Sequence, residues 1–234
     1  MKRLLSRSTL AATLMATTGL TVVGVAQAEE EWSANVGVAS EYVWRGVTQS
    51  DESPSVWGGV DYANEYFYAG AWAATTDFGP DSEAGFELDL YAGFSDTLAS
   101  GLTYDVGVIR YLYPDAGDGE DLDFTEIYGG LGFGLTDALE VGGYVYFDPD
   151  NENTYVEGTA VYAFTEVFTA DLSLGNYSFD EGEDYVNWSI GATYSAGGLD
   201  FDLRYWDTDI EAPGGGDVDG TEERIVFSIG KTFG

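Results

Sequence analysis

The chain has 234 residues, of which 42 are Asp or Glu and only eight are Lys or Arg, so its formal net charge at pH 7 is −34. It contains no Cys and no His, which excludes disulfide bonds, a Ser–His–Asp hydrolase and His-ligated zinc. So acidic a protein repels nucleic acid and anionic lipid, and an aromatic content of 15% is too high for a disordered chain.

Residues 1–28 have the features of a secretory signal peptide. Lys2, Arg3 and Arg7 precede an apolar run that ends at Ala26, and Ala26-Gln27-Ala28 is a small-x-small cleavage site. An uncleaved anchor is the alternative. All 42 acidic residues but only five basic ones follow position 28, so residues 29–234 carry a net charge of −37. We interpret this charge as a solvated surface adapted to salty surroundings, where screening is strong.

Residues 29–234 divide into short segments in which apolar and polar residues alternate. In one of them Phe86, Leu88 and Leu90 share one face, whereas Glu87 and Asp89 share the other. A period of two predicts strands with one apolar and one wet face. We predict strands near 32–46, 55–63, 66–76, 84–94, 101–112, 123–134, 139–147, 154–164, 167–178, 185–195, 199–206 and 223–233.

The connections between these segments alternate strictly between long and short. More than half of the acidic residues lie on the long connections, and only Glu65, Asp96, Asp137 and Glu166 lie on the short ones. An outer-membrane barrel sorts its connections in this way, with long external loops and short periplasmic turns. Residues 29–234 are therefore predicted to form an all-β domain, an antiparallel up-and-down transmembrane β-barrel of about 12 strands (roughly 10 or 14 are the alternatives).

Aromatic residues gather near the ends of the predicted strands. They are Trp32, Tyr42, Trp44, Tyr62, Phe67, Tyr111, Tyr113, Tyr144, Tyr146, Phe164, Phe179, Tyr185, Tyr205 and Trp206. Rings at both ends of an apolar band form the interfacial girdles of membrane barrels. We expect girdles here, although ordinary β-propensity is the simpler alternative.

Several segments resemble a known bacterial family. Residues 41–50 read EYVWRGVTQS, and the likeness continues through Pro54 and through residues 59–62, 68–73, 77–78, 87–93 and 111–114. The chain is similar in these segments to the TorF-like porin family. The resemblance implies an outer-membrane barrel with a channel role and implies no particular substrate.

The polar strand faces supply the candidates for lining a lumen. They are Glu41, Arg45, Asp61, Glu87, Asp89, Asp105, Glu126, Glu157, Asp171, Asp200, Asp202, Arg204 and Arg224. Ten acids against three bases predict a preference for cations, because confined carboxylates stabilise a positive ion. Some of these charges could instead pair with one another, Arg45 with Glu41 and Arg204 with Asp202, which would still leave acids in excess.

Two basic residues and two acidic loops need separate explanations. Arg110 and Lys231 follow the apolar faces of their strands, so we expect each at an interface near its strand end. The acidic loops 115–123 and 148–152 lack the full EF-hand pattern. We interpret them as solvated loops and predict no metal site and no cofactor.

The function predicted is a porin that passes small solutes or ions through a narrow acidic lumen. Twelve strands fall between the filled interior of about eight and the aqueous channel of about sixteen, and Trp57 or Tyr91 could plug the pore. The alternative is a non-conducting barrel with a structural or surface-binding role. A barrel enzyme and a soluble periplasmic protein are weaker rivals. Expected partners are outer-membrane lipid and small solutes or cations, with no nucleic acid; a homo-oligomer is left open.

Overall fold

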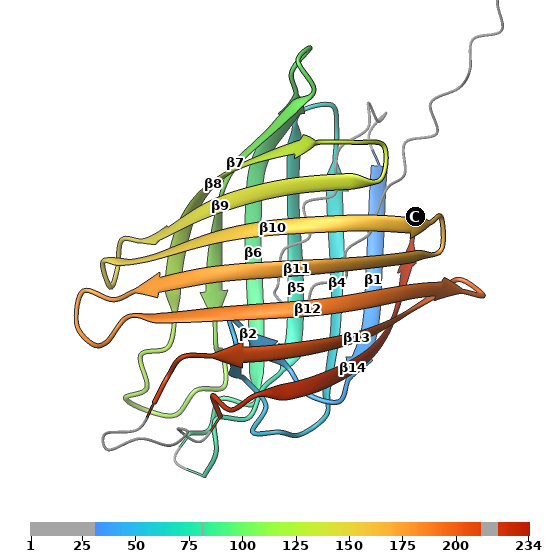
Figure 1. Ribbon diagram of the computed structural model, residues 1–234. Helices are drawn as coiled ribbons and strands as arrows, with labels where there is room; N and C mark the ends of the chain where they lie inside the picture. The colour runs from blue at the N-terminus through green and yellow to red at the C-terminus, as the bar shows by residue number, and fades with distance from the viewer. Residues whose placement is uncertain (1–30, 81, 212–219) are drawn as a thin grey trace, which may run out of the picture.

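Twelve antiparallel strands close into one barrel over the described residues of the computed structural model, which are 31–80, 82–211 and 220–234 (Figure 1). The strands of the barrel are β1 (Glu31–Ala39), β4 (Ser55–Ala63), β5 (Phe67–Thr75), β6 (Phe86–Thr97), β7 (Leu102–Leu112), β8 (Phe124–Gly134), β9 (Leu139–Asp148), β10 (Asn153–Thr165), β11 (Phe168–Ser178), β12 (Tyr185–Ala196), β13 (Leu199–Thr208) and β14 (Arg224–Phe233). The predicted signal peptide lies outside the described residues.

Each barrel strand pairs with the next one along the chain, and β1 pairs with β14 to close the sheet. The closing register runs from Ala34 opposite Phe233 to Ala39 opposite Ser228. Closure leaves no unpaired strand edge, which is how barrels avoid edge-to-edge association. The predicted all-β, twelve-stranded antiparallel barrel is confirmed, and within the described part of the chain no helix is long and apolar enough to cross a membrane.

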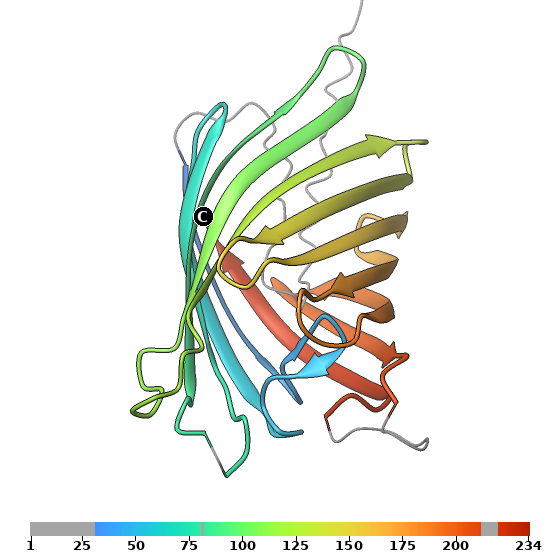
Figure 2. The same ribbon diagram turned by 90° about the vertical axis from the view of Figure 1, so that its left-hand side faces the viewer.

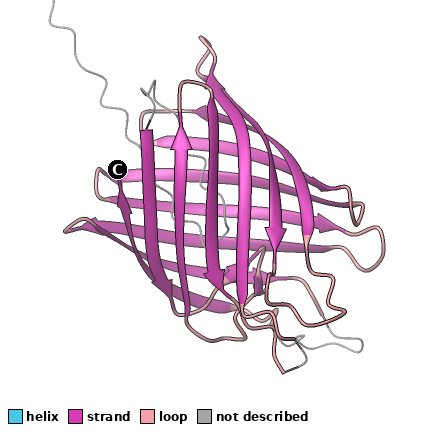
Figure 3. Cartoon of the chain, turned by 180° about the vertical axis from the view of Figure 1, so that it is seen from behind, coloured by secondary structure: helices cyan, strands magenta, loops and turns pink. Residues whose placement is uncertain are grey.

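The two ends of the barrel differ as the connection lengths predict. The end that we call the loop end carries residues 40–54, 76–85, 113–123, 149–152 and 179–184 and the connection from β13 to β14. The opposite end, the turn end, carries the short connections 64–66, 98–101, 135–138, 166–167 and 197–198 and the C-terminus (Figures 1 and 3). Five of the six loop-end connections are longer than every turn-end connection, whereas 149–152 has four residues, as do 98–101 and 135–138. The predicted alternation of long and short connections therefore holds except at 149–152.

The two faces of the barrel strands carry different kinds of side chain. On β6 the side chains of Leu90 and Phe94 are exposed on the outside of the barrel, whereas Glu87, Asp89 and Ser95 are buried inside. Large apolar side chains are exposed on every one of the twelve barrel strands except β5. Membrane barrels likewise have an apolar outer surface, which faces lipid, and a polar interior.

The first predicted strand, 32–46, is wrong at its C-terminal end. β1 stops at Ala39, and residues 40–54 fold back into the barrel as a short hairpin of β2 (Val43–Trp44) and β3 (Val47–Thr48). Figure 2 shows this hairpin, in pale blue, between the two walls. The hairpin reverses at Arg45 and Gly46, which both have a positive φ, of 50° and 86°. We call residues 40–54 the inward segment.

Candidate functional site

The tip of the inward segment is a tight two-residue turn. Val43 pairs with Thr48 and Trp44 with Val47, which leaves Arg45 and Gly46 as the two central residues. Positive φ at both central positions defines a type I′ turn, which prefers Asn or Gly. An arginine in the left-handed region is uncommon, and such outliers persist where surrounding contacts hold them.

Gly46 packs directly against the inner wall of the barrel. A Cβ atom built on it would lie 2.6 Å from Cγ2 of Thr208 on β13 and 2.9 Å from Cβ of Asn187 on β12. The turn therefore needs glycine both for its backbone conformation and for space. Backbone hydrogen bonds anchor the rest of the segment: Thr48 N–H donates to Gly220 C=O at 3.0 Å, and Asp77 N–H donates to Gln49 C=O at 2.8 Å.

Arg45 crosses to the opposite wall and binds Glu126 on β8. Its two terminal nitrogens donate to the two carboxylate oxygens of Glu126 at 2.7 and 2.8 Å, and Tyr111 O–H donates to the same carboxylate at 3.1 Å. Arg45 is only 3% exposed and Glu126 only 1%. A buried, bidentate, charge-assisted pair is the strong form of an ion pair.

An aromatic cage surrounds the Arg45 guanidinium. Its central carbon lies 4.1 Å from the ring centres of Trp44 and Tyr155, 4.9 Å from that of Tyr177 and 5.0 Å from that of Tyr146. These distances are within the range of cation–π attraction. Tyr185 O–H also donates to the Arg45 carbonyl at 3.1 Å. The tip thus contacts the inner wall along strands β8 to β13, of which β8 and β9 lie across the barrel from its own origin on β1.

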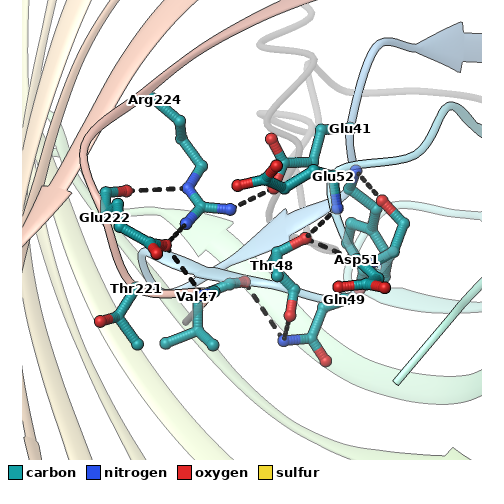
Figure 4. A network of polar contacts seen from close by, with 12 residues as sticks. Glu41, Val47, Thr48, Gln49, Asp51, Glu52, Thr221, Glu222 and Arg224 are labelled. Atoms are coloured by element: carbon teal, nitrogen blue, oxygen red, sulfur yellow. Dashed lines mark hydrogen bonds and ion pairs between the residues drawn. The ribbon is translucent and has the colours of Figure 1, made fainter. Parts of the chain in front are cut away.

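The base of the inward segment is held by a second set of charges. Arg224 at the start of β14 forms an ion pair with Glu41 and a second one with Glu222 at 3.2 Å. Figure 4 shows the Arg224 guanidinium between these two carboxylates. Arg45 does not form the pair with Glu41 that the sequence left open as an alternative. The turn carries Arg45 across the barrel, while Glu41 stays beside β14.

The third inward arginine, Arg204 on β13, forms the pair with Asp202 that the sequence left open as an alternative, and it has a further partner. It contacts Asp202 at 3.4 Å and forms a bidentate pair with Asp171 on β11 at 2.5 and 2.9 Å. Ser189 accepts another bond from it at 3.3 Å. All three inward arginines are therefore neutralised by acids.

A layer of tyrosines lies flat on the inner wall, each over a glycine of the neighbouring strand. A Cβ atom on the glycine would lie 2.3 to 2.5 Å from the tyrosine side chain in four pairs: Gly70 with Tyr91, Gly93 with Tyr68, Gly107 with Tyr128 and Gly130 with Tyr144. Trp57 covers Gly37 in the same way. The side chains named as plugs, Trp57 and Tyr91, thus lie along the wall, and the glycines make room for this arrangement.

The hydroxyl groups of these tyrosines satisfy inward carboxylates. Tyr68 O–H donates to Asp105 at 2.7 Å, Tyr144 O–H donates to the same residue at 3.3 Å, and Tyr91 O–H donates to Asp61. Several rings expected in girdles are instead inside the barrel. They are Tyr42, Trp44, Tyr111, Tyr144, Tyr146, Tyr185 and Trp206. Alternation places those on the barrel strands on the same face as the inward acids, and the inward segment carries Tyr42 and Trp44 into the interior.

The structure places all thirteen lumen candidates on the inside of the barrel. Ten are buried and Asp61, Glu157 and Asp200 are half-buried. Four acids form ion pairs with the three arginines: Glu41, Glu126, Asp171 and Asp202. Six have no ion pair among the described residues: Asp61, Glu87, Asp89, Asp105, Glu157 and Asp200. The aromatic cage was not predicted, although the motif Trp44-Arg45-Gly46 marks its centre.

The loop end carries its own local bonds. Arg110 faces outward near the end of β7 and contacts Asp150 at 3.3 Å and Asp123 at 3.7 Å. The Glu120 carboxylate accepts the backbone N–H of Gly117 at 2.7 Å, which holds the pKa of Glu120 below its usual value. Within the described ranges, no group of three or more acidic side chains is arranged to hold a metal ion.

The barrel is similar to solved outer-membrane channels at low sequence identity. A KdgM porin matches with a TM-score of 0.60 and 10% identity over 86% of this chain and 98% of its own. A NanC porin matches with a TM-score of 0.56 and 11% identity over 86% and 98%. An outer membrane channel from Pseudomonas putida F1 matches with a TM-score of 0.55 and 11% identity over 89% and 97%. These likenesses show the fold.

The family of the chain is identified at the level of sequence. No curated protein matches the chain at the level of sequence, and the TorF-like resemblance remains a prediction. A family model described as a bacterial protein of unknown function (Gcw_chp) matches residues 25–233, and the chain belongs to this family.

Proposed function

We propose that this protein is an outer-membrane channel that lets small solutes or ions diffuse passively through a narrow, acidic lumen. The observation that carries the proposal is the sorting of the two faces of a closed barrel. Exposed Leu, Ile, Val and Phe side chains cover the outside, whereas carboxylates, hydroxyls and three arginines occupy the inside. Water-soluble monomers rarely expose apolar surface on this scale, and a polar interior is typical of porins.

Cation preference is the finer part of the proposal. Six inward acids have no arginine partner in the described chain, and all three inward arginines are already paired. The remaining charge is therefore negative, and a confined negative wall favours cations over anions. A polyanionic solute such as the oligogalacturonate in the KdgM complex would be repelled by this wall, so we do not extend that ligand to this chain.

The inward segment sets the width of the channel at the loop end. Its tip contacts strands on the far side of the barrel, and Arg45 and Val43 are almost fully buried. We expect a small unitary conductance because the segment occupies part of the cross-section.

The same segment favours one alternative, a barrel that conducts nothing and serves a structural or surface-binding role. Planar-bilayer recording separates the two proposals. Protein that shows heat-modifiable gel migration, and is therefore folded, should give discrete current steps that reverse on the cation side in a salt gradient. Folded protein without any current steps would refute the channel, and reversal on the anion side would refute the cation preference.

A further inference from the structure

Asp89, near the start of β6, is a buried carboxylate that the protein leaves without a partner. The residue is 0% exposed, and neither of its carboxylate oxygens has a hydrogen-bond partner within the described chain. Buried side-chain oxygens are normally hydrogen-bonded, so each exception requires an explanation.

The neighbours of Asp89 are acids and aromatic rings. In the sheet register it lies between Trp72 on β5 and Tyr111 on β7. Glu87 is two residues away on the same inward face, and Glu87 and Glu126 are the charged groups that act on Asp89 most strongly. Both interactions are repulsive for an ionised carboxylate.

The neighbouring acids are themselves satisfied, in contrast to Asp89. Glu87 accepts Tyr42 O–H at 2.9 Å and Tyr113 O–H at 2.8 Å. Glu126 accepts both nitrogens of Arg45. The other two inward arginines are engaged elsewhere, Arg204 with Asp171 and Arg224 with Glu41, and Arg110 pairs with Asp123 and Asp150 on the outside of the barrel. No basic side chain in the described residues is therefore available to Asp89.

An ionised carboxylate in this environment requires a positive partner. Removing a charge from water without compensation is costly, and real buried charges are paired, coordinate a metal or become neutral. Among the described residues, no cationic side chain, N–H group or tyrosine O–H reaches the Asp89 carboxylate, and Glu87 on the same inward face is the one group within hydrogen-bonding reach of it. Glu87 can share a proton with Asp89 but cannot neutralise an ionised Asp89, so the counter-charge of the ionised form has to come from solution.

We propose that Asp89 binds one monovalent cation, such as an alkali-metal ion, inside the barrel. A single free carboxylate matches a single positive charge, and the absence of three converging acids in the described residues argues against a divalent ion. This proposal rests on the proposed function for the route by which the cation reaches Asp89. It adds a position inside the barrel at which a permeating cation would lose water.

The first test measures binding without current. The folded full-length protein is unfolded by heat in KCl, NaCl or choline chloride at equal ionic strength, as wild type, Asp89→Asn and Asp105→Asn. Asp105 is the matched control because it is also an inward acid but accepts two tyrosine hydroxyls. The unfolding midpoint of wild type and Asp105→Asn should rise by several degrees with K⁺ or Na⁺ and saturate. Asp89→Asn should lose the rise.

A cation response that Asp89→Asn retains would overturn the proposal, as would a wild type that shows no response. A proton is the competing occupant. If Asp89→Asn removes a pH dependence of the midpoint while wild type ignores the choice of cation, the carboxyl group is neutral and the proposal is wrong. Crystals soaked in RbCl provide a direct check, since anomalous density must appear beside Asp89.

The second test connects the site to transport. Asp89→Asn should lower the cation-over-anion permeability ratio several-fold, and Asp105→Asn should lower it less. Equal ratios in the two variants would contradict the role of Asp89 in permeation. If the protein binds cations at Asp89 but passes no current, the channel proposal fails and the binding site stands. If the protein passes current but binds no cation at Asp89, the binding site fails and the channel proposal stands.

Discussion

The strongest prediction concerns Glu126→Gln, which removes the charge opposite Arg45 but keeps the shape of the side chain. Removing one partner of a buried ion pair costs about 3–5 kcal/mol, because the other charge stays buried without compensation. The four rings at 4.1 to 5.0 Å from the guanidinium remain, and cation–π attraction of roughly 0.5–2 kcal/mol offsets part of the loss. The docked inward segment should be destabilised by roughly 2–4 kcal/mol, a shift of roughly 30- to 700-fold in its docking equilibrium.

Two measurements report this shift. Undocking widens the loop end, so single-channel recordings of Glu126→Gln should show larger or more frequent current steps than wild type. Trypsin cleaves after Arg, and the Arg45–Gly46 bond is protected while Arg45 is buried. Glu126→Gln should therefore release a fragment that begins at Gly46 faster than wild type does.

Two variants serve as controls. Arg45→Met combined with Glu126→Leu removes both charges and should recover docking, seen as wild-type conductance, because no unpaired charge is left. Asp123→Asn alters an exposed ion pair with Arg110 and should change neither conductance nor cleavage. The reasoning is refuted if Glu126→Gln keeps the wild-type conductance and the wild-type resistance to trypsin at Arg45.

Three further substitutions have defined outcomes. Gly130→Ala places a Cβ 2.3 Å from the Tyr144 ring and pushes the ring into the lumen; urea unfolding should show a loss of about 1–3 kcal/mol, and the current steps should shrink. Gly46→Ala combines a φ of 86° with a contact of 2.6 Å to Thr208, so trypsin cleavage at the turn should accelerate; unchanged cleavage would contradict the packing. Arg110→Ala breaks ion pairs whose side chains are at least 38% exposed, so unfolding should change by only about 0–1 kcal/mol; a larger change would contradict the outward position of Arg110.

The barrel could be predicted from the sequence because its determinants are local. Alternation within one strand assigns its faces, as in Leu90 and Glu87 on β6, and connection length assigns its ends. Neither signal needs knowledge of which strands face each other across the lumen. Strand number, order and the division into loop end and turn end were predictable for this reason.

The inward segment was not predictable by the same means. Trp44 and Arg45 continue the alternation of β1, so the pattern alone extends the strand. The reversal depends on contacts far along the chain, with Glu126 81 positions from Arg45 and Tyr185 140 positions from it. The rings inside the barrel were mispredicted for a related reason, since tyrosine suits both a membrane interface and a polar lumen.

The origin of any cation preference can be assigned by its salt dependence. The loops carry many acids exposed to solvent, such as Asp115 and Asp118, whereas Asp61 and Asp105 lie inside the barrel. The Debye length falls from about 10 Å at 0.1 M salt to about 3 Å at 1 M, and buried charges are screened much less than exposed ones. If carboxylates of the inner wall set the cation preference, the reversal potential should still show that preference at 1 M salt. The double variant Asp115→Asn/Asp118→Asn should then reduce the cation preference only at low salt. A preference that disappears at 1 M salt, or that these two loop substitutions abolish there, would assign the selectivity to the loops and contradict the role given to the inner wall.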